Sequence, residues 1–375
     1  MPTRRRVLLV AVLAAALLAP FALATEREEG VPLDDRLAAG VAEWVDPGVG
    51  TGSFSTGHAL FNEEWHFGTC QMAAFGFAQH AEAHPEARAA DLARVERCID
   101  MMLSEEGRAF DTRKWGADPL ATLAEDRGHA AWLGYTNLVL SVHRSLDPHS
   151  RYAAVNDALT DALARRIAAD ETSLPETYPA ERYPVDVAAG IASIGLHDRA
   201  TGADHSALLD GWTTTLRARY LDAGLLVQSV WRDGAPADAP RGSGTFLAAY
   251  FLSFWDTALA TELYRGGRAA LYDTVGGLGV MREYPVGRDG KGDIDSGPIV
   301  AGYGVSATGF AIGAARAAGD LATAAALTRT ATVMGTPVDI DGVRHWKSGA
   351  ALGGAPLADA ILFAMMTARV PPPAP

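Results

Sequence analysis

The sequence predicts an all-α protein whose helices form an (α/α)6 toroid, in which six helical hairpins close into a ring. Three observations lead to this prediction. Helical periodicity recurs along the whole chain, while strand patterns are scarce. Short and long linkers alternate between the expected helices. Helices that are apolar nearly all round alternate with helices that carry a charged face.

Twelve helices are expected from the periodicity, and the linkers between them differ in length. Short linkers such as His84-Pro85 make antiparallel hairpins, whereas long linkers return the chain to start the next hairpin. The expected helices span residues 33–45, 61–84, 87–105, 128–146, 151–169, 185–199, 203–221, 244–264, 265–275, 300–317, 319–333 and 355–368. The long linkers span residues 46–60, 106–127, 170–184, 222–243, 276–299 and 334–354.

The composition of the helices predicts which of them are internal. The helix at 151–169 has a charged outer face that includes Asp157 and Arg165. The helices near 185–199, 244–264 and 300–317 are apolar or small nearly all round, as expected of helices buried on both sides. Such helices would form an inner ring whose N-terminal ends line a cavity. An irregular superhelix of hairpins is the alternative.

The first residues have the pattern of an export signal. Residues 4–6 are arginines, residues 7–18 are apolar, and Ala22-Leu23-Ala24 offers the small residues that a signal peptidase reads. We therefore expect a signal peptide at 1–24 and an exported protein, periplasmic or extracellular, with an uncleaved membrane anchor as the alternative. The apolar run is short for a membrane span, and no later segment is long and apolar enough for one. Residues 25–375, including a proline-rich tail, are expected to form a single domain.

Charge and motifs exclude several classes of function. The formal net charge is −13, and removal of the three signal arginines would leave −16, so binding to nucleic acid is not expected. The chain lacks CxxC and HExxH motifs, so a zinc site is not expected, and no Walker A, GxSxG or GxGxxG element occurs in a supporting context, so neither nucleotide binding nor a serine hydrolase is expected. Cys70 and Cys98 are either one disulfide or two buried thiols.

Several polar residues lie at the starts of expected inner helices, where they would converge on the cavity. Glu64, Trp65 and His66 begin one helix, and a tryptophan between carboxylates and a histidine is typical of surfaces that stack on sugars. His129 begins another, where a buried core histidine is the alternative reading. Acidic residues in a first turn also simply complement the helix dipole.

Two further helix starts carry charge. Pro184 suits the first position of a helix, which places Asp186 in the first turn of an otherwise nearly uncharged helix, next to Tyr183. Arg241 precedes an apolar helix and could bind a carboxylate or sugar hydroxyls. Capping and structural ion pairing are the alternatives for these residues.

The linker before residue 300 is the richest in candidate residues. Glu283 precedes Asp293 and Asp295, which flank Ile294, and Tyr303 follows. An extended backbone would point both aspartates the same way, and two close carboxylates raise one another's pKa, as acid/base catalysis requires. An Asx-turn and a calcium site are the alternatives, although the EF-hand pattern fails.

The chain also resembles the (α/α)6 family of linalool dehydratase-isomerase over most of residues 40–335. The resemblance is carried by Trp44-Val45-Asp46, Arg127-Gly128-His129, the segment 197–202, Arg282-Glu283, the segment 293–297 and Arg316 to Asp320. It implies a toroid, a ring-like homo-oligomer, no metal and no organic cofactor, and it places Asp46 and His129 in the active site. That family's pocket carries two cysteines before the sixth helix, whereas residues 174–187 here contain none.

The leading hypothesis is therefore an exported enzyme that uses carboxylate acid/base catalysis on a polar, sugar-like substrate, as a glycoside hydrolase or lyase does. The expected catalytic residues are Asp295 and Asp186, assisted by Glu283 or His129. The expected substrate-binding residues are Asp46, Glu64, Trp65, His66, Tyr183, Arg241, Asp293 and Tyr303. A hydro-lyase or isomerase of small alcohols is the second hypothesis, and a non-catalytic glycan-binding envelope protein is the third.

Overall fold

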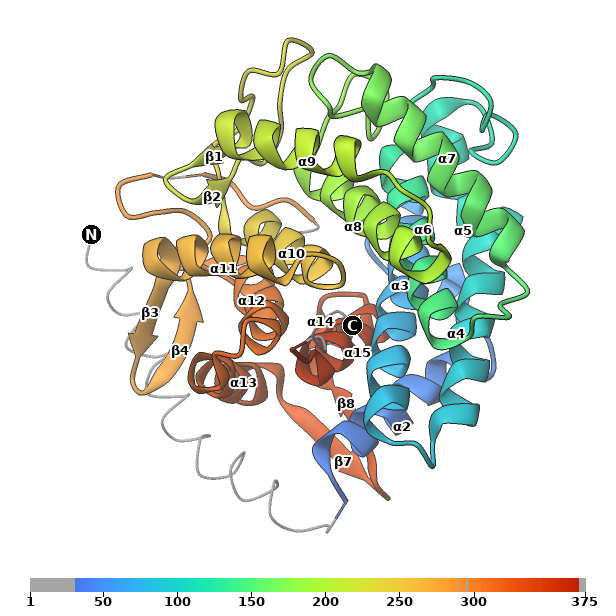
Figure 1. The fold of residues 1–375 in the computed structure, drawn as a ribbon. Coiled ribbons are helices and arrows are strands. Elements are labelled where there is room, and N and C mark those ends of the chain that lie inside the picture. Colours follow the sequence, from blue (N-terminus) through green and yellow to red (C-terminus); the bar gives the residue numbers. More distant parts are fainter. Residues whose placement is uncertain (1–30, 289, 295, 371–375) are drawn as a thin grey trace.

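The computed structural model describes residues 31–288, 290–294 and 296–370, and it is mostly helical, with only short strands (Figure 1). The prediction of an all-α class is confirmed. The predicted signal peptide at 1–24 lies outside the described residues. Among the described residues, no helix combines the length and the apolar character needed to cross a membrane.

One set of helices, called the inner helices here, lies around the centre of the molecule (Figure 1). Each inner helix contacts the next one along the chain, and the last contacts the first, so that the contacts form a closed cycle. The inner helices are α3 (Ala59–Ala83), α6 (Ala130–Leu146), α8 (Pro184–Thr201), α10 (Gly242–Ser253), α12 (Val305–Ala317) and α15 (Ala355–Thr367).

A second set, the outer helices, packs around the first. The outer helices are α2 (Leu33–Val45), α4 (Arg88–Leu103), α7 (Ala153–Ala169), α9 (Ser206–Thr215), α11 (Thr257–Leu271) and α13 (Leu321–Gly335). Each packs on an inner neighbour: α2 on α15, and the others on α3, α6, α8, α10 and α12 in that order. Burial follows this arrangement, because every residue of α10 except Leu247 is buried, while Asp157 and Arg165 of α7 are exposed.

Some helix boundaries differ from the prediction, and local capping explains the differences. The expected helices 244–264 and 265–275 divide instead at residues 254–256, because Asp256 caps α11 by accepting the N–H groups of Ala258 and Leu259 at 2.9 Å. The helix expected from residue 300 begins at Val305.

The expected linker 106–127 contains a helix that the sequence analysis missed. This helix is α5 (Glu105–Trp115), which Ser104 caps by accepting the N–H of Gly107 at 3.1 Å. Gly116 ends it in the left-handed conformation at φ 65°. The remaining short elements are a 3-10 turn (Thr51–Ser53), a π turn (Leu216–Tyr220) and α14 (Lys347–Ala351).

Four antiparallel hairpins occur among the described residues, all in linkers or at helix ends. They pair β1 (Leu221–Asp222) with β2 (Leu225–Leu226), β3 (Tyr272–Val275) with β4 (Leu278–Met281), β5 (Ile299–Val300) with β6 (Tyr303–Gly304), and β7 (Pro337–Ile340) with β8 (Val343–Trp346). The turns Gly276-Gly277 and Asp341-Gly342 have positive φ at both residues, which gives the type I′ geometry that matches strand twist.

The long linkers meet where the inner helices begin. Backbone hydrogen bonds join the start of α6 to the linker before α8 (Ala130 to Glu176, 3.1 Å) and the start of α10 to the linker before α12 (Gly242 to Glu283, 2.8 Å). A third joins the linker before α3 to the linker before α15 (Ser55 to Gly353, 2.8 Å). These bonds therefore hold the starts of the inner helices together in neighbouring pairs. Polar residues in these linkers are brought together there.

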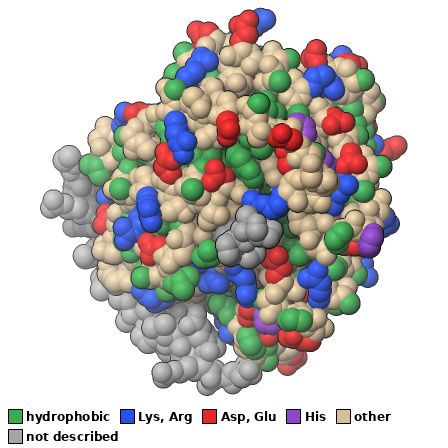
Figure 2. Space-filling model, viewed as in Figure 1, with side chains coloured by type: hydrophobic (Ala, Val, Ile, Leu, Met, Phe, Trp, Pro, Cys, Tyr) green, Lys and Arg blue, Asp and Glu red, His purple; other side chains and the backbone are tan. Residues whose placement is uncertain are grey.

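The thiols and the surface complete the description. Cys70 and Cys98 are both buried and free, as one of the two alternatives predicted, and they hydrogen-bond to each other. On the face drawn in Figure 2, acidic and basic side chains are interspersed over the described residues.

Candidate active site

Glu64, in the second turn of α3, pairs with a tyrosine from the linker that precedes α8. The hydroxyl of Tyr178 donates to Glu64 Oε1 at 2.5 Å. Burial and the nearby charge of Glu64 raise the pKa of Tyr178 well above its ordinary value. Lys114 Nζ lies 4.7 Å from the centroid of the same ring and 3.5 Å from Glu181. Tyr178 is therefore a protonated donor held against a carboxylate.

Asp186 forms a second pair of the same kind. It lies in the first turn of α8, is 7% exposed, and accepts a hydrogen bond from the hydroxyl of Tyr135 of α6. The charge of Asp186 also contributes to the raised pKa of Tyr178, so the two pairs are neighbours. We refer to Glu64, Tyr178, Tyr135 and Asp186 as the tyrosine–carboxylate group.

His129 forms a fully buried pair with Asp111 of α5. Its Nδ1 lies 2.5 Å from Asp111 Oδ2, and its ring lies 4.6 Å from that of Trp115. Burial raises the pKa of Asp111, and the hydrogen bond to His129 only partly offsets this rise. The other ring nitrogen of His129 has no hydrogen-bond partner within the described part of the chain. The residue adopts φ 50°, a left-handed conformation that is uncommon for histidine.

Surrounding residues hold His129 in this conformation. Arg166 of α7 is 2% exposed and donates to the carbonyl of Gly128 at 2.9 Å and to that of Thr122 at 2.6 Å. A side chain at Gly128 would overlap with the Glu176 carbonyl and the Trp115 ring. Buried contacts therefore hold the linker before α6 in place, and they fix the position of His129.

Arg241 organises a separate group at the start of α10. Its guanidinium is 7% exposed, donates to Asp293 and lies 3.8 Å from Glu283 Oε1. The same Glu283 oxygen accepts from the hydroxyl of Ser243 at 2.5 Å. Burial raises the pKa of Glu283, which is 0% exposed. Glu283 is therefore biased toward its neutral form.

The partners of Asp293 lower its pKa. Burial acts to raise the pKa of Asp293, but the bonds from Arg241 and Ser296 outweigh it and hold the pKa below its ordinary value. The N–H of Ser296 donates to Asp293 Oδ1 at 2.7 Å, a local side chain–backbone bond that reaches three residues along the chain, one more than in an Asx-turn. Asp295, the other member of the expected pair, lies outside the described residues.

Other expected site residues contact different partners. Asp46 ends α2, is 40% exposed, and binds Arg94 and Arg97 of α4 at 3.2 and 2.5 Å. Tyr303 lies in β6 and donates to Asp273 at 2.8 Å.

Three aromatic residues named in advance lie at helix starts. His66 is buried, with Nε2 2.6 Å from the Val49 carbonyl. Trp65 packs against the backbone of Gly354. Tyr183 donates to Glu181 at 2.9 Å.

The structure thus brings together some of the residues named in advance, and it adds others. Glu64 and Asp186 meet in one group, and Arg241, Glu283 and Asp293 meet in another. Tyr135, Tyr178 and Asp111 were missed. The available signal for Tyr135 was a tyrosine among the apolar and small residues of the first two turns of α6, because the hydroxyl of a partly buried tyrosine usually has a hydrogen-bond partner.

The chain matches no protein-family model and no curated protein.

Proposed function

We propose that residues 25–375 form one (α/α)6 toroid whose active site is the tyrosine–carboxylate group. The closed cycle of contacts among the inner helices supports the toroid, since each of them also has an outer partner. In such a ring the N-terminal ends of the inner helices surround one opening. Glu64 and Asp186 belong to two of these ends, and Tyr135 belongs to a third.

The protein is, in this proposal, an acid/base enzyme that acts on a polar, sugar-like substrate. The observation that carries it is the paired arrangement of two carboxylates, each accepting a hydrogen bond from a tyrosine hydroxyl. Asp186 serves as the base or charged partner, and Glu64 takes the other role of the acid/base pair. Tyr178, which its raised pKa keeps protonated, orients Glu64 by donating to it.

The surroundings also suit a polar substrate. Lys114 and Glu181 lie beside Tyr178, and they offer further hydrogen-bonding groups to sugar hydroxyls. Trp65 follows Glu64 on α3, and an indole ring is a common stacking surface for sugars. Arg241 and Glu283, which lie outside the tyrosine–carboxylate group, would bind sugar units that are not themselves cleaved.

A second candidate is a hydro-lyase or isomerase of small alcohols, as the resemblance to linalool dehydratase-isomerase implies. One observation favours it. The ring of Tyr135 lies 5.4 Å from that of Phe251, which lies 6.1 Å from Phe75, so apolar surface adjoins Asp186. A hydrocarbon tail would pack there while Asp186, in its protonated form, protonates the alcohol. Export and a ring-like homo-oligomer stay predictions from the sequence.

The test is turnover by isosteric variants. The purified protein is assayed on a panel of oligosaccharides and small allylic alcohols, together with D186N, E64Q and Y178F. We expect release of sugar products and a loss of about 100-fold or more in kcat/KM for D186N, as for removal of a general base. The matched control is E262Q, because Glu262 forms an exposed pair with Arg217 and its loss should leave turnover unchanged.

The outcomes separate the candidates. Turnover of alcohols alone would favour the hydro-lyase. Sugar binding that weakens in D186N without any turnover in the unmodified protein would favour a glycan-binding protein. Full activity in D186N and E64Q would overturn the assignment of the site.

A further inference from the structure

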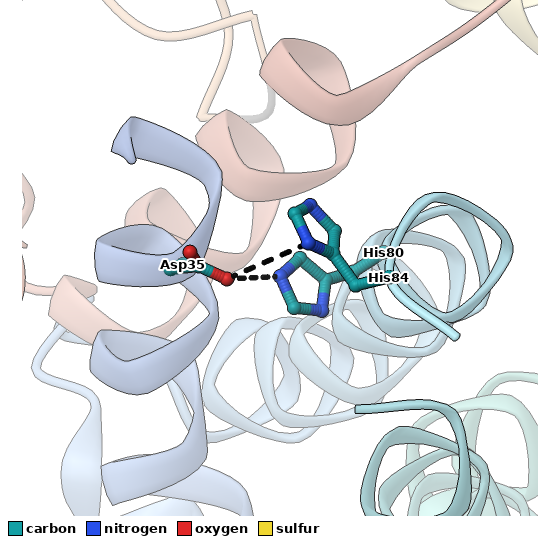
Figure 3. A group of neighbouring side chains, drawn as sticks. All are labelled: Asp35, His80 and His84. Carbon is teal, nitrogen blue, oxygen red and sulfur yellow. Dashed lines mark hydrogen bonds and ion pairs between the residues drawn. The ribbon is translucent and has the colours of Figure 1, made fainter. Parts of the chain in front are cut away.

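A group of imidazoles and carboxylates lies at the end of α3 that is remote from Glu64. His80 and His84 of α3 face Asp35 of α2 (Figure 3). Asp35 Oδ1 lies 3.1 Å from His80 Nε2 and 3.9 Å from His84 Nδ1. One ligand atom from each of the three residues lies within 4.8 Å of the other two. This spacing is close to that of three atoms that share one metal ion.

The local sequence explains why these side chains meet. His80 and His84 are four residues apart at the end of α3, so they share one helix face, and their rings stack with centroids 4.2 Å apart. Pro85 follows and disfavours continuation of the helix. Asp35 lies in the first turn of α2. His80 is sixteen residues beyond Glu64, about 24 Å along the helix, so this group is separate from the candidate active site.

A buried carboxylate behind His80 fixes the orientation of its ring. Asp91 of α4 is 1% exposed, and its Oδ2 lies 2.7 Å from His80 Nδ1. When Nδ1 donates to Asp91, the lone pair of Nε2 points toward Asp35. A carboxylate that orients a histidine in this way is the usual support of a histidine that binds a metal ion.

The charges in this region call for a cation. Asp34 lies 2.9 Å from His84 Nε2, and Glu86 lies 3.3 Å from His84 Nδ1. With Asp35 and Asp91, four carboxylates surround two imidazoles, and Arg94 reaches Asp91 at 3.3 Å. Either protons on both histidines or a divalent ion would offset most of the excess negative charge.

We propose that Asp35, His80 and His84 bind a divalent transition-metal ion of the zinc type, which joins the start of α2 to the end of α3. Two imidazole ligands favour zinc, nickel or cobalt over calcium and magnesium, which prefer oxygen ligands. With bonds of about 2.1 Å, two ligand atoms lie at most about 4.2 Å apart, so small side-chain rotations close the site. Glu86, whose carboxylate lies 3.3 Å from the same Nδ1 of His84, or water would supply the fourth ligand.

The role of this ion is structural, and the proposal does not depend on the proposed catalytic function. The ion would link helices whose ligands are 45 residues apart in the sequence. Sequence reasoning expected no metal, because it searched for CxxC and HExxH motifs. The pair His80-x-x-x-His84 was the available signal, but its third ligand is too far away in the chain to form a motif.

The test uses the full protein, stripped with EDTA and dialysed. Cobalt(II) is added first, and visible absorption between about 500 and 650 nm reports nitrogen and oxygen ligands in a site with fewer than six ligands. Zinc chloride is then titrated by calorimetry, and Tm is measured with and without zinc. We expect one zinc per chain, displacement of cobalt by zinc, a higher Tm with zinc, and no displacement by a thousandfold excess of magnesium or calcium.

Variants assign the ligands. D35N and H84Q should bind zinc at least tenfold more weakly than the unmodified protein, and zinc should no longer raise their Tm. H205Q is the matched control, because His205 is also a partly buried histidine bound to an aspartate, Asp198, at a different place. The proposal is overturned if the unmodified protein gives no cobalt spectrum and no saturable zinc binding, or if D35N and H84Q bind zinc as H205Q does.

Discussion

The replacement of Arg241 by glutamine tests how Arg241 interacts with Glu283 and Asp293. Arg241 is the cation nearest to Glu283, whose side chain is 0% exposed and whose Oε1 lies 3.8 Å from Arg241 Nε. At an effective dielectric constant of about 20, two unit charges at this distance attract by about 4 kcal/mol. The pair with Asp293 contributes less, about 1 kcal/mol, because the Asp293 side chain is 48% exposed and water screens it.

The expected loss in the free energy of unfolding for R241Q at pH 7 is about 3 kcal/mol. It is smaller than the full attraction because a buried carboxylate that loses its partner takes up a proton, which limits the loss. The pH dependence has a definite sign. Glu283 has a higher pKa in the folded protein than in the unfolded chain, where it is about 4.3. Its contribution to folding stability is therefore complete below about pH 4.3 and is lost as pH rises through the folded pKa. Without Arg241 the charged form of Glu283 has no neighbouring cation, so the stability lost as Glu283 ionises is greater. The destabilisation caused by R241Q should therefore grow from pH 4 to pH 7.

Asp293 shifts the pH dependence in the same direction. Its pKa is lowered in the folded state, so it stabilises above the unfolded pKa of about 3.9, and this stability is lost as pH falls. R241Q removes the stabilisation of charged Asp293 at pH 7. At pH 4 this stabilisation is already small, so R241Q has little effect on it. Both carboxylates therefore predict a small effect in acid and a large one at neutral pH.

Urea unfolding followed by circular dichroism at several pH values measures these differences. R217Q is the matched control, because Arg217 and Glu262 form an exposed pair and should contribute less than 1 kcal/mol. In an E283Q background, R241Q should cost only about 1 kcal/mol. Equal losses in R241Q and R217Q, or a loss in R241Q that grows toward acid pH, would refute this reasoning.

Two further predictions concern packing and the thiols. A methyl group at Gly40 would overlap with the backbone carbonyl of Arg344, so G40A should destabilise by about 1–3 kcal/mol, while G211A, at an exposed helix position with open space, should stabilise by up to about 1 kcal/mol in urea unfolding. The hydrogen bond between Cys98 and Cys70 and the burial of Cys98 raise the pKa of Cys98, so a thiol reagent should label neither cysteine in the native protein and both after unfolding without reductant. Two labelled cysteines before unfolding, or none after it, would contradict the buried-thiol structure.

The sequence was most informative where apolar periodicity is continuous. The boundaries of α2 agree with the expected helix 33–45, and α7 lies within the expected helix 151–169 with its charged face exposed. The helix α5 was missed because Phe110 is its only buried apolar residue of appreciable size, so the segment has no apolar stripe. The hairpins were missed because strands of two to four residues are too short to show alternation.

The candidate site could be predicted only in part, for a related reason. Asp186 and Glu64 were predicted because a carboxylate near the start of a mostly apolar helix usually has a capping, ion-pairing or catalytic role. Their tyrosine partners are far away in the chain, since Tyr178 is 114 residues from Glu64 and Tyr135 is 51 residues from Asp186. No local pattern encodes such a contact, because the packing of the inner helices creates it.

The most direct test of the proposed function is a crystal structure of the protein soaked with mixed oligosaccharides and small terpenoid alcohols. We predict a sugar bound between the carboxylates of Asp186 and Glu64, within hydrogen-bonding distance of the hydroxyls of Tyr135 and Tyr178. The separation of the two carboxyl groups would then indicate the reaction, because about 5 Å favours retention and about 6.5–9.5 Å favours inversion at a glycosidic carbon. A ligand that binds only elsewhere, with these four residues untouched, would contradict the proposal.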